Sequence, residues 1–241
     1  MEVSRDSLRI KLFADGADLA GMIEMASKAH IAGLTTNPTL MRKSGITDYA
    51  KFAKEVIREI PNKPISFEVF SDDLKEMELQ ALKIASWGEN VFVKIPITNA
   101  KGHPTSVVVS NLSKRGIKIN VTALTTIEQV REISIFLNPE IPSYVSVFAG
   151  RIADTGRNPI PTIKQSLECL SDNKACELIW ASPRELLNVI EADSIGCHVI
   201  TATSDILAKL HLIGKDLVDY SLETVKMFRN DALESGLSIQ E

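Results

Sequence analysis

Short apolar runs alternate with longer amphipathic stretches along the whole chain. The short runs are nearly continuous in hydrophobic residues, which predicts strands that are buried on both faces of a sheet. The longer stretches repeat their apolar residues at helical spacing. The predicted strands are 8–14, 34–36, 64–70, 91–97, 117–123, 143–149, 177–181 and 197–201. The predicted helices are 18–31, 47–60, 72–86, one within 104–114, 126–137, 159–170, 183–192 and 204–212.

Eight strand-then-helix units in 241 residues predict an α/β fold, the closed (β/α)8 barrel. We expect residues 1–241 to form a single barrel domain. A further amphipathic segment, 217–233, exceeds what a barrel needs and predicts a C-terminal helical extension at 215–236. A doubly wound open sheet is the alternative. That fold would favour a glycine-rich loop after the first strand, where Gly16 stands alone.

Composition narrows the class of protein. The net charge is -4 and there is no basic stripe with interleaved aromatics, which argues against nucleic acid as a partner. No apolar run reaches the ~18 residues of a membrane span, and the first residues lack a hydrophobic signal core. The three cysteines cannot all pair within one chain, which favours reduced thiols in the cytoplasm. Neither the cysteines nor the four histidines have the spacing of a metal site.

Lys94 is the most informative residue, because it lies in the middle of the apolar run 91–98. An isolated buried ammonium costs several kcal/mol, so it must be paired, solvated or neutralised. Burial lowers the pKa of a lysine, and a free amine attacks carbonyls to form a Schiff base. The alternative is a lysine at a strand end that extends to water. The absence of an acidic neighbour in the run favours the functional interpretation.

Polar residues recur at the C-terminal ends of the predicted strands, where (β/α)8 barrels carry their chemistry. A single polar residue in a strand is usually a satisfied core group, and a single one after a strand can be a cap. Their recurrence from strand to strand favours a common site. The candidates are Asp15, Thr36, Asn37, Glu68, Lys94, Asn120, Thr122, Ser146, Phe148, Arg151, Ser182 and Arg184.

Carbonyl chemistry through an iminium fits this set. Asp15 and Glu68 would supply two carboxylates in two environments, the usual way to separate acid and base roles. Thr122 would hold a water for Glu68 to activate. Asn37 and Asn120 are neutral and would orient substrate hydroxyls.

Arg151, Ser182 and Arg184 suggest a phosphate site, because a guanidinium presents a fork to phosphate oxygens and a helix start presents N–H groups. The structural alternatives are an ordinary helix N-cap at Ser182-Pro183 and a surface ion pair at Arg151.

Six short motifs in order resemble the transaldolase family of class I aldolases, in its short single-domain branch with the fructose-6-phosphate aldolases. The resemblance covers roughly residues 8–213. The motifs are Phe-Ala-Asp at 13–15, Gly-Leu-Thr-Thr-Asn-Pro-Thr at 33–39, Val-Phe-Val-Lys-Ile-Pro at 91–96, Asn-Val-Thr at 120–122, Ser-Val-Phe-Ala-Gly-Arg at 146–151 and Ala-Ser-Pro-Arg at 181–184.

The resemblance implies roles for these residues. Lys94 would form the Schiff base, Asp15 would exchange the proton of the hydroxyl at the cleaved bond, and Glu68 with Thr122 would transfer protons through water. The substrate would be a sugar phosphate, as in the pentose phosphate pathway, with no metal or organic cofactor. The region after Gly214 would contact a neighbouring subunit in a homo-oligomer, often a decamer. Substrate contacts are expected from Thr36, Asn37, Asn120, Ser146, Phe148, Arg151, Ser182 and Arg184.

Two positions favour transfer of dihydroxyacetone over its release. At Glu68 and Phe148 the chain resembles true transaldolases, whereas the related aldolases carry glutamine and tyrosine at these positions. The chain departs from the family pattern after Arg151, at Pro183 and at Gly16, all near the phosphate end of the expected pocket. An aldolase that releases dihydroxyacetone and a non-catalytic sugar-phosphate-binding barrel therefore stay open as alternatives.

Overall fold

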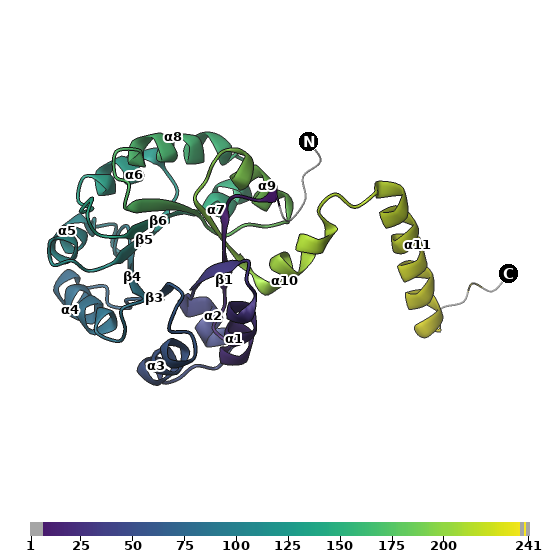
Figure 1. The fold of residues 1–241 in the computed structure, drawn as a ribbon, viewed down its shortest axis with the longest axis horizontal. Helices are drawn as coiled ribbons and strands as arrows, with labels where there is room; N and C mark the ends of the chain where they lie inside the picture. The colour runs from purple at the N-terminus through teal and green to yellow at the C-terminus, as the bar shows by residue number, and fades with distance from the viewer. Residues whose placement is uncertain (1–6, 237–238, 240–241) are drawn as a thin grey trace.

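The computed structural model describes residues 7–236 and 239 (Figure 1). Eight parallel strands close into a barrel in sequence order, and β8 pairs with β1. This confirms the predicted (β/α)8 barrel over the open sheet. The strands are β1 (Lys11–Asp15), β2 (Ile31–Thr35), β3 (Ile65–Glu68), β4 (Val91–Pro96), β5 (Ile119–Leu124), β6 (Ser143–Val147), β7 (Cys176–Trp180) and β8 (Val199–Thr203).

Helices surround the barrel as a ring (Figure 1). The helices are α1 (Leu19–Ser27), α2 (Pro38–Lys43), α3 (Tyr49–Glu59), α4 (Leu74–Ala85), α5 (Ser106–Lys114), α6 (Ile127–Ser134), α7 (Ala149–Asp154), α8 (Ile160–Leu170), α9 (Leu187–Ser194), α10 (Ser204–Leu207), the 3-10 helix η2 (Ala208–Leu212) and α11 (Leu217–Glu234), which lies outside this ring. The helices α2 and α7 directly follow β2 and β6 and were not predicted. Six residues are too few to show a helical period in the sequence.

Several boundaries differ from the prediction for local reasons. The strand β2 begins at Ile31, which the periodicity assigned to a helix. The Lys63 ammonium donates to the carbonyls of Ala26 (2.6 Å), Lys28 (3.3 Å) and Ile31 (2.6 Å), and so satisfies the C-terminal end of α1 and the turn into β2. The helix predicted over 183–192 begins only at Leu187.

The barrel interior has an apolar floor beneath a polar layer. Successive side chains of a strand point to opposite faces, so residues two apart share the interior. The inward apolar residues and the polar residues two positions later are Phe13 and Asp15, Phe92 and Lys94, Tyr144 and Ser146, and Val199 and Thr201. The Phe13 ring lies so close to Gly33 that a Cβ there would be 2.5 Å from it. The apolar floor therefore closes the barrel below the polar residues.

The helix α11 stands away from the barrel (Figure 1). None of its residues is buried, and its large apolar side chains are exposed: Leu217, Val218, Tyr220, Leu222, Val225, Met227, Phe228 and Leu233. The Asp216 carboxylate caps the helix by accepting from the N–H groups of Val218 and Asp219. Within the described residues, no helix has both the length and the apolar character needed to cross a membrane.

Candidate active site

A cavity of about 380 Å³ opens at the C-terminal ends of the barrel strands. It brings together residues from all eight strands or the segments that follow them. Nine of the twelve predicted site residues line it: Asp15, Asn37, Glu68, Lys94, Thr122, Ser146, Phe148, Arg151 and Ser182. The other three, Thr36, Asn120 and Arg184, do not line it.

Lys94 on β4 is paired inside this cavity. Its side chain is 8% exposed, and its Nζ lies 3.1 Å from Oε2 of Glu68 on the adjacent β3. The same Nζ donates to the carbonyl oxygen of Thr36 at 2.8 Å. The paired carboxylate compensates the burial of the ammonium. It is also a proton acceptor within reach of the amine, which must lose a proton before it can attack a carbonyl.

Asp15 at the end of β1 is a second carboxylate in a different environment. Its Oδ1 accepts from the Thr35 hydroxyl at 2.8 Å, and its Oδ2 accepts from the Asn37 amide at 3.1 Å. Asn37 is held in place because its Oδ1 caps α2 by accepting from the Leu40 N–H at 2.9 Å. Burial raises the pKa of Asp15, while the Lys94 charge and the two hydrogen bonds oppose that rise. A carboxyl with a raised pKa is suited to exchange a proton with a substrate hydroxyl.

A buried polar chain supports the wall between β3 and β6. The Ser146 hydroxyl donates to Asn120 Oδ1 at 2.7 Å, and the Asn120 amide donates to Ser66 Oγ at 3.0 Å. Asn120 is fully buried, so it orients Ser146 from behind. Thr36 is also fully buried, and its hydroxyl donates to the Ser66 carbonyl at 2.9 Å. Thr36 therefore meets Lys94 through its backbone carbonyl only.

Thr122 presents a free hydroxyl at an irregular point of β5. Its Oγ1 is buried and makes no hydrogen bond with the described residues, although Thr122 lines the cavity. The next residue, Ala123, has φ +66°, and the pairing of β5 with β6 shifts between Val121 and Leu124. This irregularity leaves the hydroxyl available to a ligand in the cavity.

The basic residues at the cavity rim differ in what they contact. Arg151, on α7, lines the cavity. Arg184 does not: its Nε donates to Asp154 Oδ1 at 2.9 Å, its Nη2 pairs with Asp154 Oδ2, and its Nη1 donates to the Ser182 carbonyl at 3.1 Å. The hydrogen bonds from Arg184 lower the pKa of Asp154. Arg184 is thus engaged with the segment that carries Ser182.

The backbones of α7 and the segment after β7 touch directly. Ser182 has φ +57°, and it is not an N-cap, because α9 begins only at Leu187. The Gly150 N–H donates to the Ala181 carbonyl at 3.4 Å. A Cβ on Gly150 would lie 1.6 Å from the Ser182 carbonyl oxygen, so only glycine permits this approach. The contact places Arg151 and Ser182 on the same rim of the cavity.

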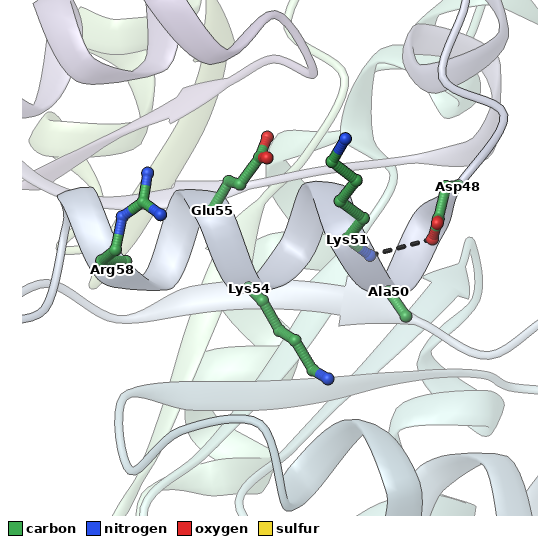
Figure 2. A pocket seen from close by; sticks show the side chains of 6 residues that line it. All are labelled: Asp48, Ala50, Lys51, Lys54, Glu55 and Arg58. Atoms are coloured by element: carbon green, nitrogen blue, oxygen red, sulfur yellow. Dashed lines mark hydrogen bonds between the residues drawn. The ribbon is translucent and has the colours of Figure 1, made fainter.

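A second hollow, of about 500 Å³, lies on the outer face of α3 (Figure 2). Its lining comes from Asp48 and one helix: Ala50, Lys51, Lys54, Glu55 and Arg58. Asp48 accepts from the Lys51 N–H at 2.9 Å as the helix N-cap. Lys51 and Lys54 point in different directions (Figure 2), and no charged group of this hollow is buried. These contacts indicate a solvated helix face, not a site for chemistry.

The chain matches a known protein family over almost its whole length. The model of the transaldolase/fructose-6-phosphate aldolase family matches residues 12–239. The chain belongs to this family. A "Probable transaldolase" of Thermoanaerobacter sp. (strain X514) is 33% identical over 231 residues, which cover 95% of this chain and 100% of the relative. Another, from Sulfurihydrogenibium sp. (strain YO3AOP1), is 36% identical over 206 residues, which cover 83% and 88%.

A solved structure supports the fold of this family member. The crystal structure of a "putative lyase/mutase" from Burkholderia cenocepacia J2315 superposes with a TM-score of 0.60. It is 11% identical and covers 96% of this chain and 87% of that one, so the likeness concerns the barrel fold alone.

Three residues around the carboxylates were not among the predicted site residues. Thr35 and Thr201 line the cavity, and Ser66 holds Asn120. Each lies two positions from another inward residue of its own strand, which is a signal that strand alternation offers once the inward face is known. Among the described residues, no group of three or more His, Cys, Asp or Glu side chains is arranged to hold a metal ion.

The contact between α7 and the segment after β7 gives a prediction for stability. Gly150→Ala is expected to lower the free energy of unfolding by roughly 1–3 kcal/mol or more, because the new methyl group would overlap the Ser182 carbonyl. Denaturant unfolding measures this loss. The matched control is Gly16→Ala, whose Cβ would meet its nearest neighbour at an ordinary 3.7 Å. Equal stability of the two variants would contradict the close approach.

Proposed function

We propose that this family member is a transaldolase, which transfers a dihydroxyacetone unit from a ketose phosphate to an aldose phosphate through a Schiff base on Lys94. The observation that carries the proposal is the buried Lys94 ammonium, 3.1 Å from Glu68 in a cavity that also contains Asp15. A nucleophilic amine with two carboxylates in distinct environments is the equipment that iminium chemistry needs. The family match and the names of the relatives support the same reaction.

In the first half of the reaction, Lys94 captures the ketose. Glu68 accepts a proton from the ammonium, and the neutral amine adds to the carbonyl carbon to form a carbinolamine. Glu68 and a water held by the free Thr122 hydroxyl then move protons onto the carbinolamine oxygen. Loss of that oxygen as water gives the iminium, which is an electron sink for the next step.

Asp15 then drives cleavage and transfer. It takes the proton of the hydroxyl at the bond that breaks, the bonding electrons move into the iminium, and an aldehyde leaves. The enamine that remains adds to the carbonyl of the acceptor aldose, and Asp15 returns its proton to the new hydroxyl. Water then adds to the product iminium and the carbon–nitrogen bond breaks, which releases the new ketose and restores the Lys94 amine. Phe148 lines the cavity and carries no acidic hydrogen that would protonate the enamine. This supports transfer over release of dihydroxyacetone.

The remaining cavity residues hold the sugar. Ser146, oriented by Asn120, and Asn37 are placed to bind the dihydroxyacetone hydroxyls. Arg151 and Ser182 lie on one rim and are suited to the phosphate. Arg184 supports this rim through its bonds with Asp154 and the Ser182 carbonyl. Thr36 contributes its carbonyl to the position of the Lys94 amine.

The first test traps the covalent intermediate. Incubation with fructose 6-phosphate and borohydride is expected to add one reduced sugar fragment to Lys94, because the reagent converts an iminium to a stable secondary amine. Mass spectrometry of the digested protein locates the adduct. Lys94→Met should abolish it, and the exposed Lys83→Met is the matched control that should retain it. No adduct with any of a panel of ketose phosphates would refute the enzyme and leave a sugar-phosphate-binding barrel.

The second test separates transfer from release. With fructose 6-phosphate alone we expect little turnover, because the enamine keeps the dihydroxyacetone unit until an acceptor arrives. Addition of erythrose 4-phosphate should raise the rate strongly, as measured by a coupled assay for glyceraldehyde 3-phosphate. An acceptor-independent rate that equals the acceptor-dependent rate would favour the fructose-6-phosphate aldolase alternative.

We also propose that the chain is one barrel domain, residues 1–241, whose extension at 215–236 contacts a second copy in a homo-oligomer, such as a decamer. Helical geometry gathers the exposed apolar residues of α11 on one broad side, opposite Asp219, Glu223, Lys226 and Asn230. A helix with no buried residue has little reason to fold on its own, so a partner surface would supply its packing.

The same proposal places the protein in the cytoplasm and in sugar-phosphate metabolism, such as the pentose phosphate pathway. The three cysteines are free, and burial raises the pKa of Cys176 to about 11, which keeps that thiol protonated. Reduced thiols of this kind fit a reducing compartment.

The extension gives a prediction for assembly. The pair Val225→Asp and Phe228→Asp, on the apolar side of α11, is expected to reduce the molar mass in solution to that of a smaller assembly, because charges would replace buried apolar contacts. Light scattering after size exclusion measures the mass. The control pair is Lys226→Asp and Asn230→Asp on the polar side. If both pairs leave the mass unchanged, α11 is not the contact.

A further inference from the structure

A pair of threonine hydroxyls stands behind Asp15. The Thr35 Oγ1 lies 2.8 Å from Asp15 Oδ1 and 2.5 Å from the Thr201 Oγ1. The three residues come from adjacent strands, because β1 lies between β2 and β8 in the barrel. Thr35 and Thr201 are buried, and both line the cavity. Their hydroxyls therefore form a short chain that ends on the carboxylate.

The direction of this chain follows from counting protons. An ionised carboxylate only accepts hydrogen bonds, and a hydroxyl has one proton to give. The Thr35 proton is committed to Asp15 Oδ1, so the bond between the two threonines must run from Thr201 to Thr35. When Oδ1 itself becomes protonated, its O–H needs an acceptor. Thr35 can accept only by turning its own proton toward Thr201, so the whole chain reverses.

We propose that Thr201 is a positioning residue for Asp15, which acts through Thr35 to hold the carboxylate in place and reverses its hydrogen bond when Asp15 takes up a proton. The inference rests on the proposed function, in which Asp15 accepts and returns the proton of a substrate hydroxyl. A reversible chain of this kind keeps both oxygens of Asp15 satisfied on either side of the proton transfer, since the Asn37 amide serves Oδ2.

The surroundings of Asp15 determine in which direction its pKa would move when the Thr35 hydrogen bond is weakened. The charged groups that act on it are Lys94 on β4 and Glu68 on β3. The adjacent strands β2 and β8 contain no titratable residue. Burial raises the pKa of Asp15, and the Thr35 hydrogen bond lowers it. Weakening that bond should therefore raise the pKa further. A base must be ionised to act. The loss of activity on the acid side of the pH profile would therefore begin at a higher pH.

The test begins with the free protein and does not depend on the reaction. Carbon-13 NMR of the side-chain carboxyls gives the titration of Asp15, assigned by its loss in Asp15→Asn. Thr35→Val should raise the midpoint by about 1–2 pH units, since it removes a hydrogen bond to a charged group. Thr201→Val should raise it by a few tenths of a unit through loss of cooperative strengthening. Thr201→Ser, which keeps the hydroxyl, should restore the wild-type value.

The same variants are then assayed for turnover. The acid limb of kcat/KM in Thr201→Val should move upward with the NMR midpoint, while the control Thr203→Val, two positions along β8, should leave it unchanged. If Thr201→Val does not fold, Thr201→Ala removes the hydroxyl without adding bulk. An unchanged midpoint and acid limb in a folded Thr201 variant would overturn the proposal. If the wild type turns over no sugar phosphate, the proposed function fails, and the NMR midpoints still decide the role of Thr201.

Discussion

The pairing of Lys94 with Glu68 is the interaction on which the site depends. A lysine whose side chain is 8% exposed is tolerable only with a partner, and the partner comes from the adjacent strand at the same level of the barrel. The pairing also has a chemical consequence. The group that compensates the buried charge is a proton acceptor 3.1 Å from the amine, so the structure that stabilises the ammonium also provides the route to the nucleophile.

Barrel closure explains how this pair can exist above a hydrophobic core. The strands β1, β4, β6 and β8 each contribute an apolar inward residue and, two positions later, a polar one, so the interior changes from apolar to polar within one layer. Phe13 packs edge-on against Tyr144 with ring centroids 5.5 Å apart, directly below the layer that contains Asp15 and Ser146. The apolar floor excludes water from one side of the site, which strengthens the electrostatic interactions in the layer above.

Much of this arrangement was predictable, and what was not depends on neighbours across strands. Continuous apolar runs predicted eight buried strands, and the polar residues at their ends predicted the members of the cavity, including the lysine and both carboxylates. Arg184 was predicted to bind phosphate, but its guanidinium contacts Asp154. Asp154 lies on α7, a helix too short for the sequence periodicity to predict. Ser66 and Thr201 were hidden for a similar reason, because their importance depends on strand register, which brings Asn120 and Thr35 next to them.

Glu68 and Asp15 differ in chemical behaviour because their interaction partners differ. Glu68 faces the Lys94 ammonium directly, whereas Asp15 faces a hydroxyl and an amide, both neutral donors. The Thr35 hydroxyl can turn to accept a hydrogen bond when the carboxylate gains a proton, whereas an ammonium has no lone pair to accept one. In the proposed reaction Glu68 gains its proton from that same ammonium, whereas Asp15 exchanges its proton with the substrate and keeps the Thr35 hydroxyl as a partner in either protonation state. This follows from the threonine pair behind it as much as from its place at the end of β1.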